Sequence, residues 1–256
     1  MSTLAAELPG IDAHTHLDGG RFDPAVLELG ERLGIGLFLC SNLGAFQPHP
    51  GMDEVREMNG VLAGELRRHP ERLRGYCYVN PRFGREALDD LRRNVEDRGM
   101  IGVKLWIATL ADDPLTDPIL EYAAAHRLIV LAHAWRKTVQ RFPYESTAVH
   151  IARAAARHPE VRFVMAHLGG QPETAADVVG PHANVAVDTS GTIIGAGEVA
   201  LAVRRLGADR VVFGSDLHHI DLAANVGKVL GAGLDAEQEE RVFGGNLRHW
   251  LAEVRS

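Results

Sequence analysis

Residues 10–20 read GIDAHTHLDGG, and this stretch introduces the pattern from which we predict the fold. Two histidines, His14 and His16, stand one residue apart after an apolar start at Ile11 and Ala13. Because the side chains of a β-strand point alternately to its two faces, the two imidazoles are expected to share one face. Two interpretations are open: the histidines lie on the water-facing side of a surface strand, or both of their rings point at one metal ion.

The composition is that of an ordinary globular protein, with 46% hydrophobic and 24% charged residues. The 256 residues suffice for two small domains or for one large fold such as an α/β barrel. A net charge of −7 disfavours nucleic acid and anionic membranes as partners. No apolar run is long enough to span a bilayer, so no membrane partner is predicted.

The first residues and the cysteines bear on the cellular location. Residues 1–10, MSTLAAELPG, have neither the basic region nor the sustained apolar region of a secretory signal peptide. Cys40 and Cys77 both lie in apolar runs and are expected to be buried free thiols in a reducing compartment. The predicted location is therefore the cytoplasm.

The apolar pattern of the opening stretch recurs along the chain. Short runs rich in Val, Ile, Leu and Phe alternate with longer segments of helical spacing, and about eight such units can be counted. The expected strands are Ile11–Leu17, Gly34–Ser41, Leu73–Val79, Gly102–Ile107, Leu128–Ala134, Arg162–Leu168, Asn184–Thr189 and Arg210–Ser215. This alternation predicts an α/β fold with a parallel sheet covered by helices. A single closed (β/α)8 TIM barrel over residues 1–256 is favoured over an open doubly wound sheet.

Polar groups stand at the ends of five of these predicted strands. They are His14 and His16 in the first, Lys104 in the fourth, His133 in the fifth, His167 in the sixth and Asp216 in the eighth. In a barrel these ends meet at one mouth, where buried imidazoles and a carboxylate need a common partner. Such ligands suit zinc, and also manganese, iron or nickel. Because the ligands are scattered through the chain and include no thiolate, a catalytic metal site is predicted.

Each of these residues has an ordinary explanation when it is considered alone. A histidine at a strand end, such as His133 or His167, is often a hydrogen-bonded pocket residue. Lys104 could be an ion-pair partner, and Asp216 could cap the helix that follows it. The joint pattern favours the metal site, because suitable groups at five strand ends of one barrel rarely coincide by chance.

Several motifs resemble those of the amidohydrolase superfamily. They are DAHTHL, GVKLW, LAHAW, MAHLGG, VDTSG, VFGSDLHH and VFGGNLRHWL, which occur in the family's order between Ile11 and Leu251. The resemblance is to the branch often labelled amidohydrolase 2, which also holds decarboxylases and hydratases of aromatic and dicarboxylic acids. It implies a distorted TIM barrel with the metal centre at the C-terminal face of the strands.

The resemblance also implies roles for individual residues. The residues that match the family's core metal ligands are His14, His16, His133 and Asp216. His167 matches a histidine that binds a second metal in two-metal members and is catalytic in one-metal members. Lys104 corresponds to a lysine that two-metal members carry in carboxylated form, and Trp106 stands where this branch usually has histidine. Zinc is the expected metal, and one ion is favoured over two.

The expected reaction is hydrolysis of a C–N or C–O bond in a small molecule by a metal-activated water. Asp216 would be both a ligand and the general base, and His167 would stabilise the oxyanion or orient the nucleophile. Asp188 and Ser190 are expected to orient a ligand histidine.

Four residues are predicted to contact the substrate. Trp106 and Trp135 follow the predicted ligands at a spacing of two residues, so they would face the mouth if strand alternation continues. Arg136 follows Trp135 directly, and one of His218 and His219, which follow Asp216 in a loop, is expected to contact the substrate. Aromatic walls with an arginine nearby would suit a planar or aromatic substrate that carries a carboxylate.

Other functions compete with hydrolysis. A metal-dependent decarboxylase or hydratase of a small carboxylic acid is the main alternative, although many decarboxylases of the branch have glutamate in place of His14. A non-catalytic binding barrel is disfavoured by the presence of Asp216 and His167. Nucleotide binding would rest on the run GTIIGAG at residues 191–197, which lacks the dinucleotide fingerprint. The predicted partner is a small-molecule substrate, and the family resemblance makes a homodimer the alternative to a monomer.

Overall fold

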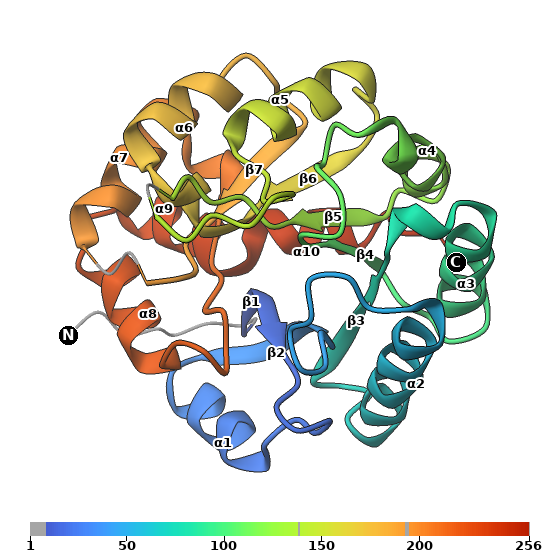
Figure 1. Cartoon of the computed structure of the whole chain (residues 1–256). Helices are drawn as coiled ribbons and strands as arrows, with labels where there is room; N and C mark the ends of the chain where they lie inside the picture. The colour runs from blue at the N-terminus through green and yellow to red at the C-terminus, as the bar shows by residue number, and fades with distance from the viewer. Residues whose placement is uncertain (1–8, 138, 193–194, 256) are drawn as a thin grey trace.

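The computed structural model of the chain describes residues 9–137, 139–192 and 195–255. Within these ranges, eight parallel strands pair in sequence order from first to last. The strands are β1 (Gly10–His16), β2 (Ile35–Ser41), β3 (Leu73–Tyr78), β4 (Gly102–Leu105), β5 (Ile129–Ala132), β6 (Arg162–Met165), β7 (Val185–Asp188) and β8 (Val211–Val212). They form the centre of the molecule, and the helices surround them (Figure 1). The predicted (β/α)8 barrel is thus confirmed.

In the described part of the chain, one α-helix lies between each pair of consecutive strands, and three more follow β8. They are α1 (Pro24–Arg32), α2 (Met52–Arg68), α3 (Arg85–Glu96), α4 (Asp117–Ala125), α5 (Ala148–Arg157), α6 (Pro172–Val179), α7 (Ala196–Leu206), α8 (Leu222–Leu230), α9 (Ala236–Glu240) and α10 (Asn246–Leu251). In α2, acidic residues stand in the first turn, and Arg67 and Arg68 stand in the last. These charges oppose the helix dipole at both ends, and Pro70 prevents its continuation.

Backbone hydrogen bonds between β1 and the segment after β8 close the ring. The amide of Ala13 donates to the carbonyl of Phe213 at 2.8 Å, and the amide of His16 donates to that of Leu217 at 2.7 Å. The amide of Asp216 donates to the carbonyl of His14 at 2.8 Å. The eighth strand was expected to reach Ser215 but ends earlier, since these residues pair with β1 as irregular backbone. This closure places Asp216 beside the two histidines of β1.

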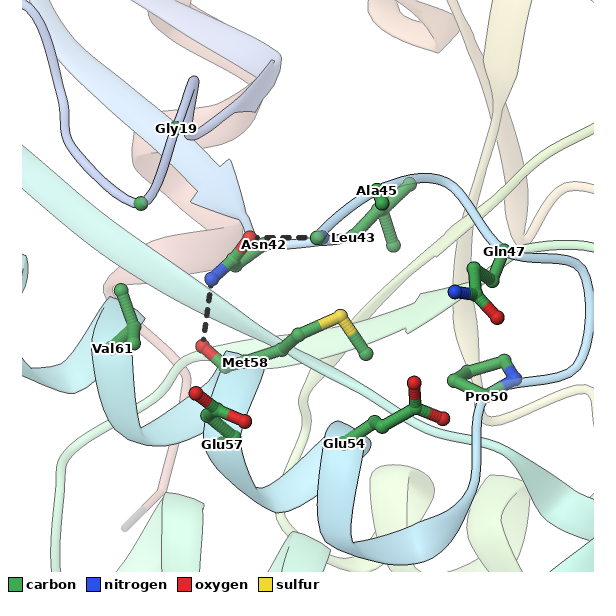
Figure 2. A pocket seen from close by; sticks show the side chains of 12 residues that line it. Gly19, Asn42, Leu43, Ala45, Gln47, Pro50, Glu54, Glu57, Met58 and Val61 are labelled. Carbon is green, nitrogen blue, oxygen red and sulfur yellow. Dashed lines mark hydrogen bonds between the residues drawn. The ribbon is translucent and has the colours of Figure 1, made fainter.

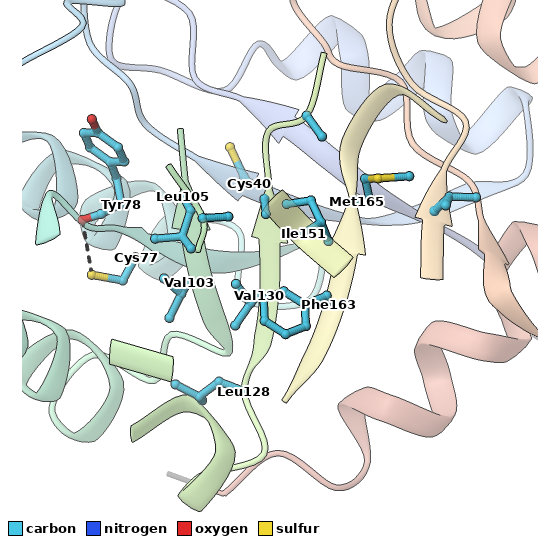
Figure 3. Close-up of a cluster of buried hydrophobic side chains, with 14 of the residues drawn as sticks. Cys40, Cys77, Tyr78, Val103, Leu105, Leu128, Val130, Ile151, Phe163 and Met165 are labelled. Atoms are coloured by element: carbon cyan, nitrogen blue, oxygen red, sulfur yellow. Dashed lines mark hydrogen bonds between the residues drawn. The ribbon is translucent and has the colours of Figure 1, made fainter. Parts of the chain in front are cut away.

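Two clusters of buried apolar side chains hold the barrel together. The larger lies between the strands and the helices; Figure 3 shows part of it, with Val103, Val130 and Phe163 on neighbouring strands. These three residues stand opposite one another in the strand register. The smaller cluster includes Ile129 and Leu131, the alternate positions of β5. This period of two directs one set of side chains to the helices and the other to the barrel interior.

The structure also bears on the predictions for the cysteines, for membrane-spanning helices and for the first residues. Cys40 and Cys77 are buried and free, as predicted. No helix in the described ranges is long and apolar enough to cross a membrane. Residues 1–8, which carry most of the signal-peptide prediction, lie outside the described residues, as do residues 193–194 of the GTIIGAG run.

Candidate metal centre

Three predicted ligands converge at the carboxyl end of the barrel. Nε2 of His14 lies 3.2 Å from Nε2 of His16. Oδ1 of Asp216 lies 3.6 Å from the first of these nitrogens and 3.3 Å from the second. Ligand atoms that share a tetrahedral ion at bond lengths of about 2.0–2.2 Å lie roughly 3.3–3.6 Å apart. Two of the three spacings lie in this range and the third, 3.2 Å, is close to it, so they suit a single divalent ion.

Hydrogen bonds fix which nitrogen of each β1 histidine faces this centre. Nδ1 of His14 lies 2.9 Å from a carboxylate oxygen of Asp188 and 3.1 Å from the hydroxyl of Ser190. Since a carboxylate accepts, Nδ1 carries the proton and Nε2 keeps its lone pair for a metal. Nδ1 of His16 lies 2.8 Å from the hydroxyl of Ser41, so its Nε2 is the nitrogen that faces the centre. Ser41 was not predicted, although it ends the second strand as the other candidates end theirs.

His133 and His167 extend the same cluster. Nδ1 of His133 lies 3.2 Å from Nε2 of His167. The other nitrogen of His167 pairs with the hydroxyl of Ser190 at 2.9 Å. The other nitrogen of His133 donates to Oε1 of Glu145 at 3.0 Å. The structure thus brings together the four predicted histidines, each with one nitrogen left for the centre.

The backbone at two of these residues adopts a left-handed conformation that non-glycine residues rarely occupy. The φ angle is 61° at His167 and 64° at Asp216. The amide of His167 donates to Oδ1 of Asp188 at 2.8 Å, which helps to hold this conformation. Such backbone persists where surrounding contacts enforce it, commonly at functional sites. Here it turns both side chains toward the centre from segments that have just left their strands.

Lys104 belongs to the same group. Its side chain is buried, and its Nζ lies 2.7 Å from Nε2 of His14. Burial lowers the pKa of Lys104 to about 8, against the opposing effect of the carboxylates of Asp216 and Asp188. At neutral pH a larger fraction of Lys104 is therefore in the uncharged amine form than of an exposed lysine.

Burial also sets the charge of the other groups. It lowers the pKa of all four histidines, because a buried imidazolium loses its hydration; these residues are His14, His16, His133 and His167. Burial raises the pKa of Asp216 to about 6, although the charge of Lys104 lowers it. Neutral imidazoles whose lone pairs face one another are costly to bury without a cation. The donor set therefore fits a divalent metal.

A cavity of about 410 Å³ opens above this centre. Its walls include Trp106 and Trp135, as predicted, together with Phe46 and Phe142. The ring of Trp106 meets Phe46 edge to face at 5.6 Å, and Trp135 lies 4.9 Å from the ring of His167. The cavity thus has aromatic walls over a polar floor.

Two residues predicted to contact the substrate lie outside this cavity. Arg136 is exposed and does not line it, whereas Lys137 does. His218 packs on the ring of Phe22 at 5.9 Å, and His219 takes its place on the wall. The period of two extends to Trp106 and Trp135, whereas Arg136 and His218 lie in loops without a regular period, so spacing did not indicate where their side chains point.

Glu145 is a member of the site that the sequence did not indicate. It lies in the loop after β5, and its buried carboxylate accepts from His133 and from Nζ of Lys137 at 2.7 Å. Burial by itself would raise the pKa of Glu145, but these two hydrogen bonds hold it below its usual value. No motif marks Glu145, because its contact with His133 spans a loop without regular period.

A second cavity of about 480 Å³ lies between the loops after β1 and β2 and the helix α2 (Figure 2). The side-chain amide of Asn42 forms hydrogen bonds within the cavity wall. It donates to the carbonyl of Met58 and accepts from the amide of Gly44. Glu54 and Glu57 line its outer side. No predicted ligand borders it.

Comparisons with known proteins add a family and a fold. A sequence-family model described as "Amidohydrolase" matches residues 11–250. No curated protein shows a significant sequence match to this chain.

Solved structures of similar fold include several enzymes. The crystal structure of 2,6-dihydroxybenzoate decarboxylase from Rhizobium has a TM-score of 0.79 and 17% identity, covering 96% of this chain and 99% of that chain. Dihydroxybenzoic acid decarboxylase from Polaromonas sp. JS666, with bound manganese and the inhibitor 2-nitroresorcinol, has a TM-score of 0.78, 15% identity and coverages of 96% and 97%. 4-Oxalomesaconate hydratase from Rhodopseudomonas palustris has a TM-score of 0.67, 14% identity and coverages of 95% and 96%. These likenesses show the fold.

Proposed function

This chain belongs to the amidohydrolase family, and from that premise we propose that it is a metal-dependent lyase that decarboxylates a small aromatic acid. The observation that carries the proposal is the set of four histidines and one carboxylate beneath an aromatic-walled cavity. The decarboxylases and the hydratase of similar fold support a lyase, which the sequence favoured only second to hydrolysis.

One divalent ion is proposed at this centre. His14, His16 and Asp216 would hold it, and His133, whose Nδ1 lies 3.2 Å from Nε2 of His167, is proposed as a further ligand. When bound, the ion would polarise a substrate oxygen and lower the pKa of a bound water. Manganese and zinc both suit these ligands. Asp188 lies near the centre but already accepts from His14 and His167, so it is assigned to orientation rather than ligation.

The reaction needs a proton at the carbon that loses the carboxyl group. When the C–C bond breaks, carbon dioxide leaves and the electron pair stays on the ring carbon, which then takes a proton. Asp216 lines the cavity and its side chain is 15% exposed, so its carboxyl group can hold that proton and deliver it. His167 would hydrogen-bond a substrate oxygen and keep the ring in place. The tryptophan walls would stack on a planar ring.

Hydrolysis is the second candidate, and it is favoured by the two histidines of β1, His14 and His16. In this branch many decarboxylases carry glutamate where this chain has His14. With the histidine, and with Lys104 2.7 Å from its ring, the centre also suits activation of water. Asp216 would then take a proton from the attacking water and pass it to the leaving group.

The two candidates are separated by their products. Protein loaded with Mn²⁺ or Zn²⁺ is incubated with a panel of hydroxybenzoates and, in parallel, with small lactones and amides. Release of carbon dioxide from an aromatic acid, absent from an Asp216→Asn variant, is the expected result. Acid released from a lactone or amide without carbon dioxide would favour hydrolysis. No turnover of either panel by metal-loaded protein would contradict both.

Other expectations from the sequence stay predictions. They are a single domain over residues 1–256, a cytoplasmic location, the absence of a nucleic-acid partner and a homodimer. The net charge of −7 supports the expectation on nucleic acid. Light scattering on the purified chain would test the oligomeric state.

A further inference from the structure

The cavity mouth carries an ion pair that the proposed reaction does not use. Nζ of Lys137 lies 2.7 Å from Oε1 of Glu145, whose side chain is fully buried. The side chain of Lys137 is 29% exposed and lines the cavity. The carboxylate therefore lies behind the ammonium group, on the side of His133, while the ammonium faces the mouth.

Aromatic rings hold this ammonium in place. Nζ of Lys137 lies 4.9 Å from the ring centre of Phe142 and 6.0 Å from that of Trp135, within the range of cation–π attraction. Both rings also line the cavity. Because an ammonium group has three N–H donors and one is directed at Glu145, the others can meet a ligand stacked between these rings.

The charges around the cavity favour an anionic ligand at two separate places. Lys104 lies at the floor and Lys137 at the mouth, and the carboxylate of Glu145, which pairs with Lys137, is fully buried behind the ammonium. A divalent ion at the floor would add further positive charge there. The positive charge at the mouth stands apart from the floor, since Glu145 and the ring of His133 come between.

We propose that Lys137 determines substrate specificity by binding a second acidic group, on the ring edge remote from the metal centre. The substrate class is then an aromatic acid that carries another carboxylate. This inference rests on the proposed function, because it takes the first carboxylate to bind at the metal centre. Glu145 contributes by holding the ammonium at the wall.

The test compares two probes that differ by one carboxylate. Mn²⁺-loaded wild-type protein is titrated calorimetrically with benzoate and with isophthalate (benzene-1,3-dicarboxylate). We expect isophthalate to bind about tenfold more tightly, as a partly exposed charged hydrogen bond allows. In Lys137→Met the affinity for isophthalate should fall to that for benzoate, while the affinity for benzoate stays unchanged. Lys137→Arg should keep most of the preference, because it restores the positive charge.

The outcomes distinguish this inference from the proposed function. An isophthalate preference that is lost in Lys137→Met and kept in Lys137→Arg supports it. Equal weakening of both acids in Lys137→Met would overturn it, since Lys137 would then act through Glu145 on the metal centre. If wild-type protein binds benzoate but does not prefer isophthalate, the inference fails and the proposed function stands. If neither acid binds, both are overturned.

Discussion

For single residues, the chemistry of this protein depends on which ring nitrogen each histidine turns inward. Asp188 and Ser190 bind the outer nitrogen of His14, and Ser190 also binds that of His167. A single pair of residues, Asp188 at the end of β7 and Ser190 just after it, thereby orients one imidazole on β1 and one just after β6. The fixed tautomers leave lone pairs for a metal, which is the condition for ligation.

Asp216→Asn should leave the fold intact and reduce kcat at least about a hundredfold, because the amide cannot hold and return a proton. The measurement is the rate of carbon dioxide release from whichever aromatic acid the substrate panel identifies. Metal content, measured by elemental analysis, is the control, since asparagine keeps an oxygen ligand. A variant that retains a near wild-type rate would remove Asp216 from the proposed chemistry.

Glu145→Gln should weaken metal binding about ten- to a hundredfold while the fold persists. The amide can still accept from His133, but it has no charge to strengthen that hydrogen bond and leaves Lys137 without its ion pair. Competition with a fluorescent chelator measures the affinity. Glu160→Gln, at an exposed position, is the matched control and should have no effect. Equal affinities in the two variants would mean that Glu145 does not orient His133.

For the elements of secondary structure, close packing between strands decides how accurately the site is held. The residues that converge on the centre lie on or just beyond different strands, so each strand must keep its register with its neighbours. Gly102 at the start of β4 shows how tight this packing is. A Cβ added there would lie 2.3 Å from the carbonyl oxygen of Ile129 and 2.7 Å from the ring of Tyr76. Lys104 follows two residues later on the same strand.

Gly102→Ala should lower the free energy of unfolding by about 2–3 kcal/mol, because overpacking forces the strands apart. Denaturant unfolding measures the change. Gly64→Ala in α2 is the matched control, since a Cβ there meets nothing within 4 Å. That substitution should stabilise the protein by about 0.5–1 kcal/mol through helix propensity. A neutral effect of Gly102→Ala would show that β4 can shift without cost.

For the whole molecule, the metal centre should be coupled to stability. The ligands come from β1 at one end of the chain and from the segment after β8 at the other, so an ion that binds them also joins the two edges of the barrel. A ligand that binds only the folded state stabilises it by mass action.

Saturating Mn²⁺ or Zn²⁺ should raise the thermal midpoint by about 5–10 °C relative to chelator-treated protein. A free concentration a hundredfold above Kd adds about 2.7 kcal/mol, and each kcal/mol shifts Tm by about 2–4 °C at this chain length. Scanning calorimetry provides the measurement. His14→Ala should lose most of the shift, and an unchanged shift in that variant would place the bound metal elsewhere.

The sequence by itself determined the barrel, the order of its strands and the position of the polar strand ends. These features follow from local patterns: apolar runs with flanking helices predict strands, and strand ends in a barrel must meet. The position of a residue at a strand end was accordingly enough to select the candidates, among them His14, His16, Lys104 and His133. The family was also found in this way, through the motifs that follow the strands.

Only the tertiary structure decided what the loops contribute. Glu145 and Lys137 reach the cavity from segments without a regular period, so no spacing in the sequence indicated where their side chains point. Of the neighbouring histidines His218 and His219, the structure places the second on the cavity wall. Arg136 and His218, which were expected to contact the substrate, do not line the cavity. Contacts between residues far apart in the chain depend on how the whole barrel closes, and closure follows from the packing of all its strands together.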